Sequence, residues 1–204
     1  MIVVIDYGMG NLGSILNMLK KIGAPAQVSS NADDIAGASK LILPGVGAFD
    51  AGMKRLAELN LIDLLNDKAL NQKTPTLGVC LGMQLLTRKS QEGVLPGLGW
   101  IAGETVRFHF DSQHAHLKIP HMGWNTITLE KPGALFAGLD STARFYFVHS
   151  YHIVCECADD VVTTTEYGYA FVSALERDNI FGAQFHPEKS HKFGMRVLKN
   201  FVER

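Results

Sequence analysis

Residues 74–84 decide the fold, and they read Thr74-Pro75-Thr76-Leu77-Gly78-Val79-Cys80-Leu81-Gly82-Met83-Gln84. A short apolar run ends in Gly-x-Cys-x-Gly and passes straight into a segment with helical spacing. This is the cysteine counterpart of the Gly-x-Ser-x-Gly nucleophile elbow, a strained strand-to-helix turn that exposes the reactive side chain above a sheet. A thiol at the start of a helix is also favoured as thiolate. The stretch therefore predicts a nucleophilic Cys80, and a buried core cysteine is the alternative.

Two backbone N–H groups near Cys80 are candidates for an oxyanion hole. One belongs to Leu81, the residue that follows the predicted nucleophile. The other comes from the turn Pro44-Gly45-Val46-Gly47, which follows an apolar strand and reaches the same edge of the sheet. Its glycines leave the peptide groups of Val46 and Gly47 free to turn an N–H toward a ligand. An ordinary strand–helix turn is the alternative for this segment.

The base that a cysteine nucleophile needs is predicted in Gln184-Phe185-His186-Pro187-Glu188. An apolar strand ends here, which places His186 at the strand end and Glu188 just beyond it. In cysteine catalysis an imidazole takes the thiol proton and returns it to the leaving amine, while a carboxylate fixes the tautomer of the imidazole. Together with the elbow, this segment predicts a Cys80–His186–Glu188 triad.

Strands and helices alternate in the first half of the chain. Apolar strands are predicted at residues 2–6, 26–29, 40–43 and 76–79, with helices at 11–22, near 33–37 and within 49–71. Buried strands that alternate with helices indicate a parallel sheet with helices on both faces. Ligands of such folds bind beyond the carboxyl ends of the strands, where the elbow lies.

The pattern changes from about Trp100 to strands in succession. They are predicted at 105–108, 125–129, 144–148, 152–157, 161–166, 171–176 and 180–184, and a helix at 191–203 closes the chain. Several of these strands would form an antiparallel extension of the sheet or a small second sheet. Cys155 and Cys157 would alternate on one strand face and are expected to be structural. Because no linker or repeat interrupts residues 1–204, we expect a single α/β domain.

Composition and charge exclude several classes of protein. The 204 residues are 47% apolar with a formal net charge of −1, which fits a sizeable core and gives no general attraction to nucleic acid or anionic membranes. No apolar run approaches the roughly 18 residues of a membrane span, and the N-terminus lacks the basic region of a signal peptide. Three cysteines form no disulfide framework. We expect a cytoplasmic protein that binds neither nucleic acid nor a membrane.

One glycine motif suggests a different activity. Gly8-Met9-Gly10-Asn11-Leu12-Gly13 matches the Gly-x-Gly-x-x-Gly fingerprint of dinucleotide-binding sites. Such a site also needs an acidic residue at the end of the second strand to hold the ribose, and the chain has Ser29-Ser30 there, with Asp33 beyond it. We therefore expect a tight strand–helix turn near the site and no cofactor.

Aromatic and histidine side chains gather in two further segments, 120–125 and 145–151. Their aromatic density is consistent with a pocket wall or a partner face. For Phe145 and Phe147, packing within a strand is the preferred interpretation. No metal is expected, because four histidines lack the ligand spacing of a structural zinc site: His109, His114, His116 and His121.

Taken together, these motifs resemble those of the class I (triad) glutamine amidotransferases. The resemblance rests on Gly-Val-Cys-Leu-Gly-Met-Gln, Pro-Gly-Val-Gly-Ala-Phe and Gln-Phe-His-Pro-Glu-Lys-Ser. Residues 5–12, 120–125 and 146–151 further resemble the HisH branch, the glutaminase subunits of imidazole glycerol phosphate synthases. The motifs cover essentially the whole chain in order. The resemblance implies a flavodoxin-like fold with a mostly parallel sheet, flanking helices and an antiparallel extension.

The resemblance also implies roles for individual residues. Cys80 would be the nucleophile, His186 the acid and base, and Glu188 the carboxylate that orients the imidazole. Contacts with the substrate glutamine would fall on Gln84, Glu92, Ser150 and Tyr151, with backbone groups near Gly47. Three others match positions that the family places near a partner face: Trp124, Tyr146 and Lys189.

The implied reaction is hydrolysis of glutamine to glutamate through a γ-glutamyl thioester, with release of ammonia. In the family, the ammonia passes through a (β/α)8-barrel cyclase partner, HisF, with which the glutaminase forms a heterodimer. The ammonia attacks a phosphoribulosyl formimino precursor and yields imidazole glycerol phosphate and an aminoimidazole carboxamide ribotide in histidine biosynthesis.

Local departures from the histidine-pathway pattern leave the ammonia acceptor open. The chain has Ser90-Gln91-Glu92-Gly93 where family members commonly have two consecutive acids. The segments 108–111 and 189–194 resemble HisH-type paralogues of surface-polysaccharide pathways, which move ammonia onto a sugar with a HisF-like partner. Histidine biosynthesis is the preferred interpretation. A γ-glutamyl hydrolase or protease, which would act without a partner, and a silent binding module, which would not need the triad, are alternatives from other classes.

Overall fold

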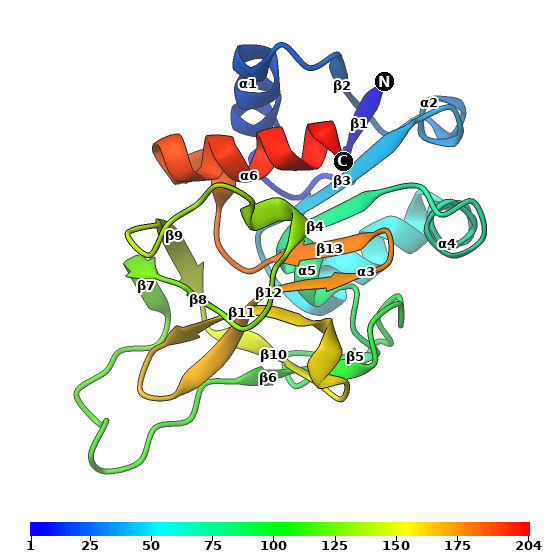
Figure 1. The fold of residues 1–204 in the computed structure, drawn as a ribbon. Helices are drawn as coiled ribbons and strands as arrows, with labels where there is room; N and C mark the ends of the chain where they lie inside the picture. Colours follow the sequence, from blue (N-terminus) through cyan, green and yellow to red (C-terminus); the bar gives the residue numbers. More distant parts are fainter.

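Five parallel strands form the middle of the molecule. In the computed structural model, which describes residues 1–204, they lie in the order β2-β1-β3-β4-β13 (Figure 1). Their bounds are β1 Ile2–Ile5, β2 Ala26–Ser29, β3 Lys40–Gly45, β4 Thr76–Cys80 and β13 Ile180–Ala183. The first four follow the strand order of flavodoxin-like folds, and β13 takes the fifth position although it comes near the end of the chain.

Helices cover both faces of this sheet because its strands are apolar on both sides. In β1, Ile2 and Val4 pack into a core that includes residues of α1 (Leu12–Ile22) and α6 (His191–Glu203). The alternate residues of β1 pack into a second core on the other face. That core includes residues of α2 (Ala32–Ala36), α3 (Phe49–Glu58), α4 (Ile62–Asn66) and α5 (Leu81–Gln84). None of the helices combines the length and the apolarity that crossing a membrane would require.

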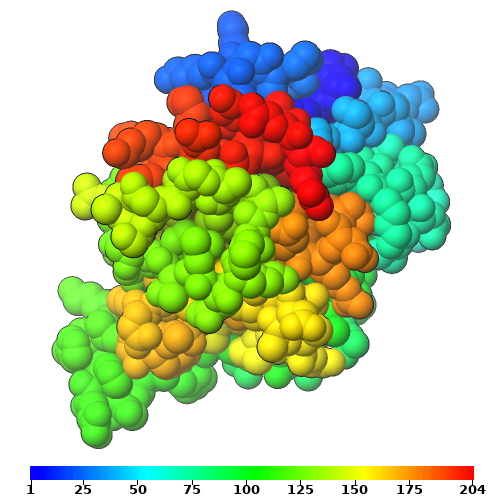
Figure 2. All heavy atoms as spheres, in the orientation of Figure 1, coloured from blue at the N-terminus to red at the C-terminus, as the bar shows by residue number.

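The second half of the chain contributes both predicted arrangements, an antiparallel extension and a small second sheet. The antiparallel extension continues from β13 through β12, β10 and β6, with β11 and β8 as a branch, and β7 pairs with β9 in a separate sheet. The short β5, from the first half of the chain, pairs with β6 in parallel. The bounds are β5 Lys89–Ser90, β6 Gly103–Arg107, β7 His121–Thr126, β8 Thr128–Leu129, β9 Arg144–His149, β10 Tyr151–Cys155, β11 Val161–Glu166 and β12 Ala170–Arg177. The segment between β6 and β7 projects from one end of the molecule (Figure 2).

Three predicted elements differ from the structure. The helical spacing after Cys80 extends to Leu86, but the helix has only four residues, and beyond it the N–H groups of Leu86 and Thr87 donate to carbonyls three residues back. The strand expected at 125–129 is divided, since β7 pairs with β9 whereas β8 pairs with β11. The strand expected at 152–157 ends at Cys155, so Cys157 is exposed in a turn and does not share a strand face with it.

The glycine-rich turn at residues 8–13 packs beside the Pro44–Gly47 turn. A side chain on Gly10 would meet Pro44 at 3.2 Å, and the Tyr7 hydroxyl donates to the Pro44 carbonyl at 2.5 Å. In a dinucleotide fingerprint the third glycine allows close packing of helix and sheet. At Gly13 an added side chain would meet nothing within 4 Å. The segment therefore forms a turn near the site, as expected, and packs against the Pro44–Gly47 turn. It lacks the close helix–sheet contact that a dinucleotide fingerprint makes at its third glycine.

Candidate active site

Cys80 is the last residue of β4 and adopts a left-handed backbone conformation, with φ +54° and ψ −112°. Residues other than glycine rarely occupy this region, and such strain is typical of functional turns. The flanking glycines are required by the close approach of backbone. A Cβ on Gly78 would lie 2.7 Å from the Gly82 carbonyl oxygen, and one on Gly82 only 1.8 Å from the Leu43 carbonyl oxygen. The sequence Gly-x-Cys-x-Gly thus forms the elbow that its spacing predicts.

The helix that follows Cys80 is a single turn, so its macrodipole is small. The titratable side chain that interacts with Cys80 is His186, which follows β13 in the chain. The Nδ1 atom of His186 lies 2.8 Å from Glu188 Oε1, and both side chains are 2% exposed. The Nε2 atom has no hydrogen-bond partner. Burial opposes the charged imidazole, but interactions with Cys80 and Glu188 outweigh it and raise the pKa of His186 to about 9.

The backbone around His186 is held by β9. Its N–H donates to the Tyr146 carbonyl at 2.9 Å. The buried hydroxyl of Ser190 donates to the His186 carbonyl at 2.6 Å and accepts from the Tyr146 N–H at 3.0 Å. These bonds attach the His-Pro-Glu turn to the second sheet and fix the imidazole relative to β4.

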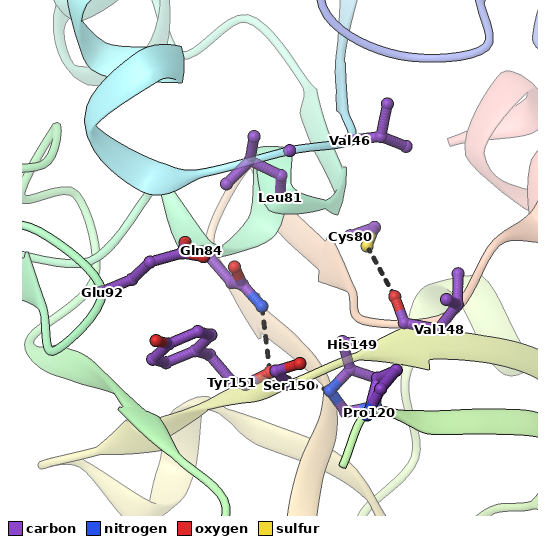
Figure 3. Close-up of a pocket in the computed structure, with 11 residues that line it drawn as sticks. Val46, Cys80, Leu81, Gln84, Glu92, Pro120, Val148, His149, Ser150 and Tyr151 are labelled. Atoms are coloured by element: carbon purple, nitrogen blue, oxygen red, sulfur yellow. Dashed lines mark hydrogen bonds between the residues drawn. The ribbon is translucent and has the colours of Figure 1, made fainter.

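A cavity of about 300 Å³ opens beside Cys80 (Figure 3). It brings together eight of the residues predicted for the site: Val46, Gly47, Cys80, Leu81, Gln84, Glu92, Ser150 and Tyr151. Pro120, Val148 and His149 complete the lining. His186 and Glu188 are not among the lining residues, and their side chains are buried.

The polar groups of the cavity are fixed by neighbouring residues. Both amide hydrogens of Gln84 are engaged, because its Nε2 donates to the Tyr151 carbonyl and to Gln184 Oε1, each at 3.0 Å. The side-chain oxygen of Gln84, Oε1, takes no part in these bonds and remains available as an acceptor. One carboxylate oxygen of Glu92 accepts from the Phe49 N–H at 2.8 Å, at the start of α3. The side chains thus present acceptors to a ligand that carries N–H groups.

The turn predicted to supply an oxyanion donor lies directly beside Cys80. In the β3–β4 ladder, Gly45 is the register partner of Cys80. A side chain on Gly45 would collide with the Tyr7 hydroxyl at 2.6 Å, so the turn packs tightly at its base. Beyond it, Val46 is exposed and Gly47 has φ +114°, a conformation suited to glycine.

The three residues predicted for a partner face lie together outside the cavity. Trp124 and Tyr146 are register partners in the β7–β9 ladder, and Lys189 Nζ lies 5.5 Å from the centroid of the Tyr146 ring. Trp124 is 42% exposed, and its ring stacks with that of His191 at 5.3 Å and an angle of 3°. The cluster is therefore an exposed aromatic and cationic surface.

Sequence reasoning missed three residues at the site. Gln184 is fully buried, and its Nε2 lies 3.7 Å from Cys80 Sγ. Ser190 holds the His186 backbone, and His149 lines the cavity. The only signal for them was their place within the quoted motifs, because a buried polar residue next to a catalytic one has no characteristic spacing.

Comparisons with known proteins agree with this geometry. The family model described as glutamine amidotransferase class-I matches residues 3–204. Similar curated proteins include imidazole glycerol phosphate synthase subunit HisH 2 of Methanococcus maripaludis, 54% identical, and the HisH 2 of Pseudomonas aeruginosa, 52% identical. Each alignment covers 100% of this chain and 99% of the relative. The HisH of Bdellovibrio bacteriovorus is 46% identical over the full length of both chains.

Solved structures share the fold at lower identity. A crystal structure of a glutamine amidotransferase has a TM-score of 0.71 at 18% identity, and the alignment covers 98% of this chain and 97% of that one. PurLQS from Thermotoga maritima has a TM-score of 0.71 at 17% identity, with 99% and 97% covered. The chain belongs to the class I glutamine amidotransferases and, within them, to the HisH family.

Proposed function

We propose that this protein hydrolyses glutamine and delivers the ammonia to a HisF-type cyclase in histidine biosynthesis, as one single-domain subunit of a cytoplasmic heterodimer. The observation that carries the chemistry is the strained Cys80 at the cavity, beside a histidine whose Nδ1 is held by Glu188. The pathway is supported by the HisH relatives, whose names assign them to imidazole glycerol phosphate synthase.

In the proposed reaction, the thiolate of Cys80 attacks the side-chain amide carbon of glutamine. The N–H of Leu81 and an N–H from the Val46–Gly47 turn stabilise the oxyanion. The C–N bond then breaks, His186 gives its Nε2 proton to the leaving ammonia, and a γ-glutamyl thioester remains. Water attacks the thioester with His186 as base, which releases glutamate and restores the thiol.

The cavity fits the polar end of glutamine. The free acceptor oxygens of Gln84 and Glu92 suit its α-ammonium group, and the backbone at Ser150 and Tyr151 would bind the rest of the molecule. The surface of Trp124, Tyr146 and Lys189 would meet the cyclase, because exposed tryptophan and tyrosine side chains are enriched in interface cores.

An alternative acceptor is a surface-polysaccharide sugar. Two of the relatives are numbered as a second HisH, and the segments 108–111 and 189–194 of this chain resemble paralogues that work with a HisF-like partner. The glutaminase chemistry would be the same in either pathway.

Glutamate release from glutamine tests the proposal, for the wild type and Cys80→Ala. Each is assayed alone, with a HisF-type cyclase and its ribotide ligand, and with a HisF-like partner of a polysaccharide pathway. Activity only with the cyclase, abolished by Cys80→Ala, is the expected result. Activity only with the other partner would move the acceptor to a sugar. Full activity of Cys80→Ala would overturn the proposed chemistry, and strong activity of the free chain would favour an independent hydrolase.

A further inference from the structure

Three hydrogen bonds in series connect strand β7 to the wall of the cavity. Asn125 Nδ2 lies 3.3 Å from His121 Nε2, His121 Nδ1 lies 3.1 Å from His149 Nε2, and His149 Nδ1 lies 2.8 Å from the Tyr151 carbonyl oxygen. Both imidazoles are buried. We call Asn125, His121 and His149 the histidine chain.

The donors and acceptors of the histidine chain can be assigned in only one consistent way. The Tyr151 carbonyl can only accept, so His149 must carry its hydrogen on Nδ1 and, when neutral, accepts at Nε2. His121 then donates from Nδ1 and accepts at Nε2 from the amide of Asn125, which also donates to the Glu166 carbonyl at 2.9 Å. Burial lowers the pKa of His121 to about 4 and that of His149 well below its ordinary value, which keeps both rings neutral.

The histidine chain spans the boundary between the two sheets, where the cavity lies. β7 and β9 belong to the small sheet and β10 to the large one, and Ser150 is the corner between β9 and β10. The Tyr151 carbonyl accepts from His149 on one side and from Gln84 on the other. Both of its acceptor positions are therefore engaged, and the orientation of this peptide group is fixed.

We propose that the histidine chain positions the Ser150–Tyr151 corner for the binding of substrate, which makes His149 a positioning residue of the glutamine site. The proposal rests on the proposed function, since it takes glutamine as the ligand of the cavity. His149 lines the cavity without reaching the reacting atoms, and its effect is on the backbone that it holds (Figure 3).

A neighbouring histidine provides a matched control. His152 is buried in the same aromatic cluster around Phe108, with ring centroids 4.7 Å apart against 5.3 Å for His149. Its Nε2 contacts the Tyr169 hydroxyl and its Nδ1 contacts the Ile153 carbonyl. It has no bond to the histidine chain, so its loss affects packing without affecting the Ser150–Tyr151 corner.

The test compares His149→Leu, His149→Asn and His152→Leu in the full chain. Asparagine keeps a donor near the Nδ1 position, whereas leucine removes it. One readout is the concentration of 2-amino-4-oxo-5-chloropentanoic acid, a glutamine-shaped chloroketone, that half-saturates alkylation of Cys80. A second is alkylation by iodoacetamide, which needs no glutamine pocket. The KM and kcat for glutamine with the activating partner are the third.

We expect His149→Leu to raise the half-saturating concentration and KM about three- to tenfold, the effect of one lost hydrogen bond. Alkylation by iodoacetamide and kcat should change much less. His149→Asn should restore most of the affinity, and His152→Leu should leave it unchanged. Equal effects of His149→Leu and His152→Leu, or no recovery in His149→Asn, would overturn the proposal.

A second variant covers the case in which His149→Leu does not fold. His121→Leu leaves His149 in place but removes the donor to its Nε2, and we expect a smaller rise in the same half-saturating concentration. An unchanged value in this variant would also overturn the proposal. If the wild type itself is alkylated by iodoacetamide but not by the chloroketone, the cavity does not bind glutamine. The inference is then rejected together with the proposed function.

Discussion

The carbonyl oxygen of Leu43 lies where a side chain on Gly82 would have to go. At this residue, the requirement for glycine comes from the approach of β3 and not from the conformation of Gly82 itself. The same elbow holds Cys80 at positive φ, so strain and close packing are concentrated within three residues. Single substitutions here are therefore expected to have large effects.

Gly82→Ala should destabilise the fold by about 3 kcal/mol or more, because its Cβ would overlap the Leu43 oxygen and the backbone would have to move. Gly13→Ala is the matched control, since it lies in α1 with open space around it and should stabilise by about 0.5–1 kcal/mol. Urea unfolding measures both. A Gly82→Ala protein as stable as the wild type would contradict the geometry of the elbow.

The pKa of His186 predicts a dependence of stability on pH. The folded-state pKa is about 9 against an ordinary 6.5, so the folded state holds the proton more tightly. The resulting stabilisation is fully present below pH 6.5 and is lost as the pH rises to about 9. Cys80→Ala removes one of the two groups that raise this pKa.

In Cys80→Ala, the pKa of His186 should fall, which NMR titration of labelled histidine rings measures. The decrease in unfolding free energy between pH 6.5 and 9 should become smaller in the same variant. Cys157→Ala, which removes an exposed thiol, serves as the control and should leave both quantities unchanged. The same titration in Cys80→Ala as in the wild type would show that the thiol does not interact with the imidazole.

At the scale of elements, a buried lysine joins two helices. Lys68 lies in the π-helical turn that follows α4 and is 3% exposed. Its ammonium donates to the Ala36 carbonyl at 2.8 Å, the Ala38 carbonyl at 2.9 Å and the Gln72 side chain at 3.0 Å. A cation at the end of α2 is also favoured by the helix dipole. The side chain thus connects the π-helical turn to the last residue of α2, Ala36, and to Ala38 just beyond it.

Lys68→Met should lower the free energy of unfolding by about 1–3 kcal/mol, because the buried carbonyl of Ala38 loses its donor and the carbonyl of Ala36 also loses its bond to the ammonium. Lys54→Met, at a side chain 72% exposed in α3, should change it by less than about 0.5 kcal/mol. Chemical denaturation of the two variants gives the comparison. Equal free energies of unfolding for the two variants would mean that the three contacts of Lys68 give no net stabilisation.

At the scale of the whole molecule, the second sheet places the exposed cluster of Trp124, Tyr146 and Lys189 next to the site. β9 carries Tyr146 on the outside while its backbone holds His186 and Ser190. Docking at this surface would therefore contact the strand that positions the imidazole. In the proposed function, this is the face that meets the cyclase.

Trp124→Ala should weaken binding of the cyclase about 30-fold, the value expected for a central aromatic of an interface. Stability of the free chain should change little, because the ring is 42% exposed and stacks mainly on the equally peripheral His191. Val154→Ala, an exposed apolar residue of β10, is the control. Calorimetric titration measures affinity, and unchanged affinity of Trp124→Ala would exclude this face.

Much of the fold could be predicted because its signals are local. Apolar strands, helical spacing and the Gly-x-Cys-x-Gly turn are each contained in about ten residues, and the helix 191–203 was predicted with its observed bounds. The predictions failed where the structure depends on which strands pair with each other. Residues 125–129 were divided because two different strands pair with them, and β5 was missed because two residues have no period of their own.

The sequence by itself determined the elbow, the alternation of strands and helices and the residues proposed for the triad, since short motifs encode turns and reactive groups. Only the tertiary structure decided that β13 lies beside β4, which brings Gln184 to Cys80 across 104 residues of chain. It also decided that His149 joins β7 to the cavity wall. Strand pairing and buried hydrogen bonds depend on distant residues, and no local pattern specifies which of them will meet.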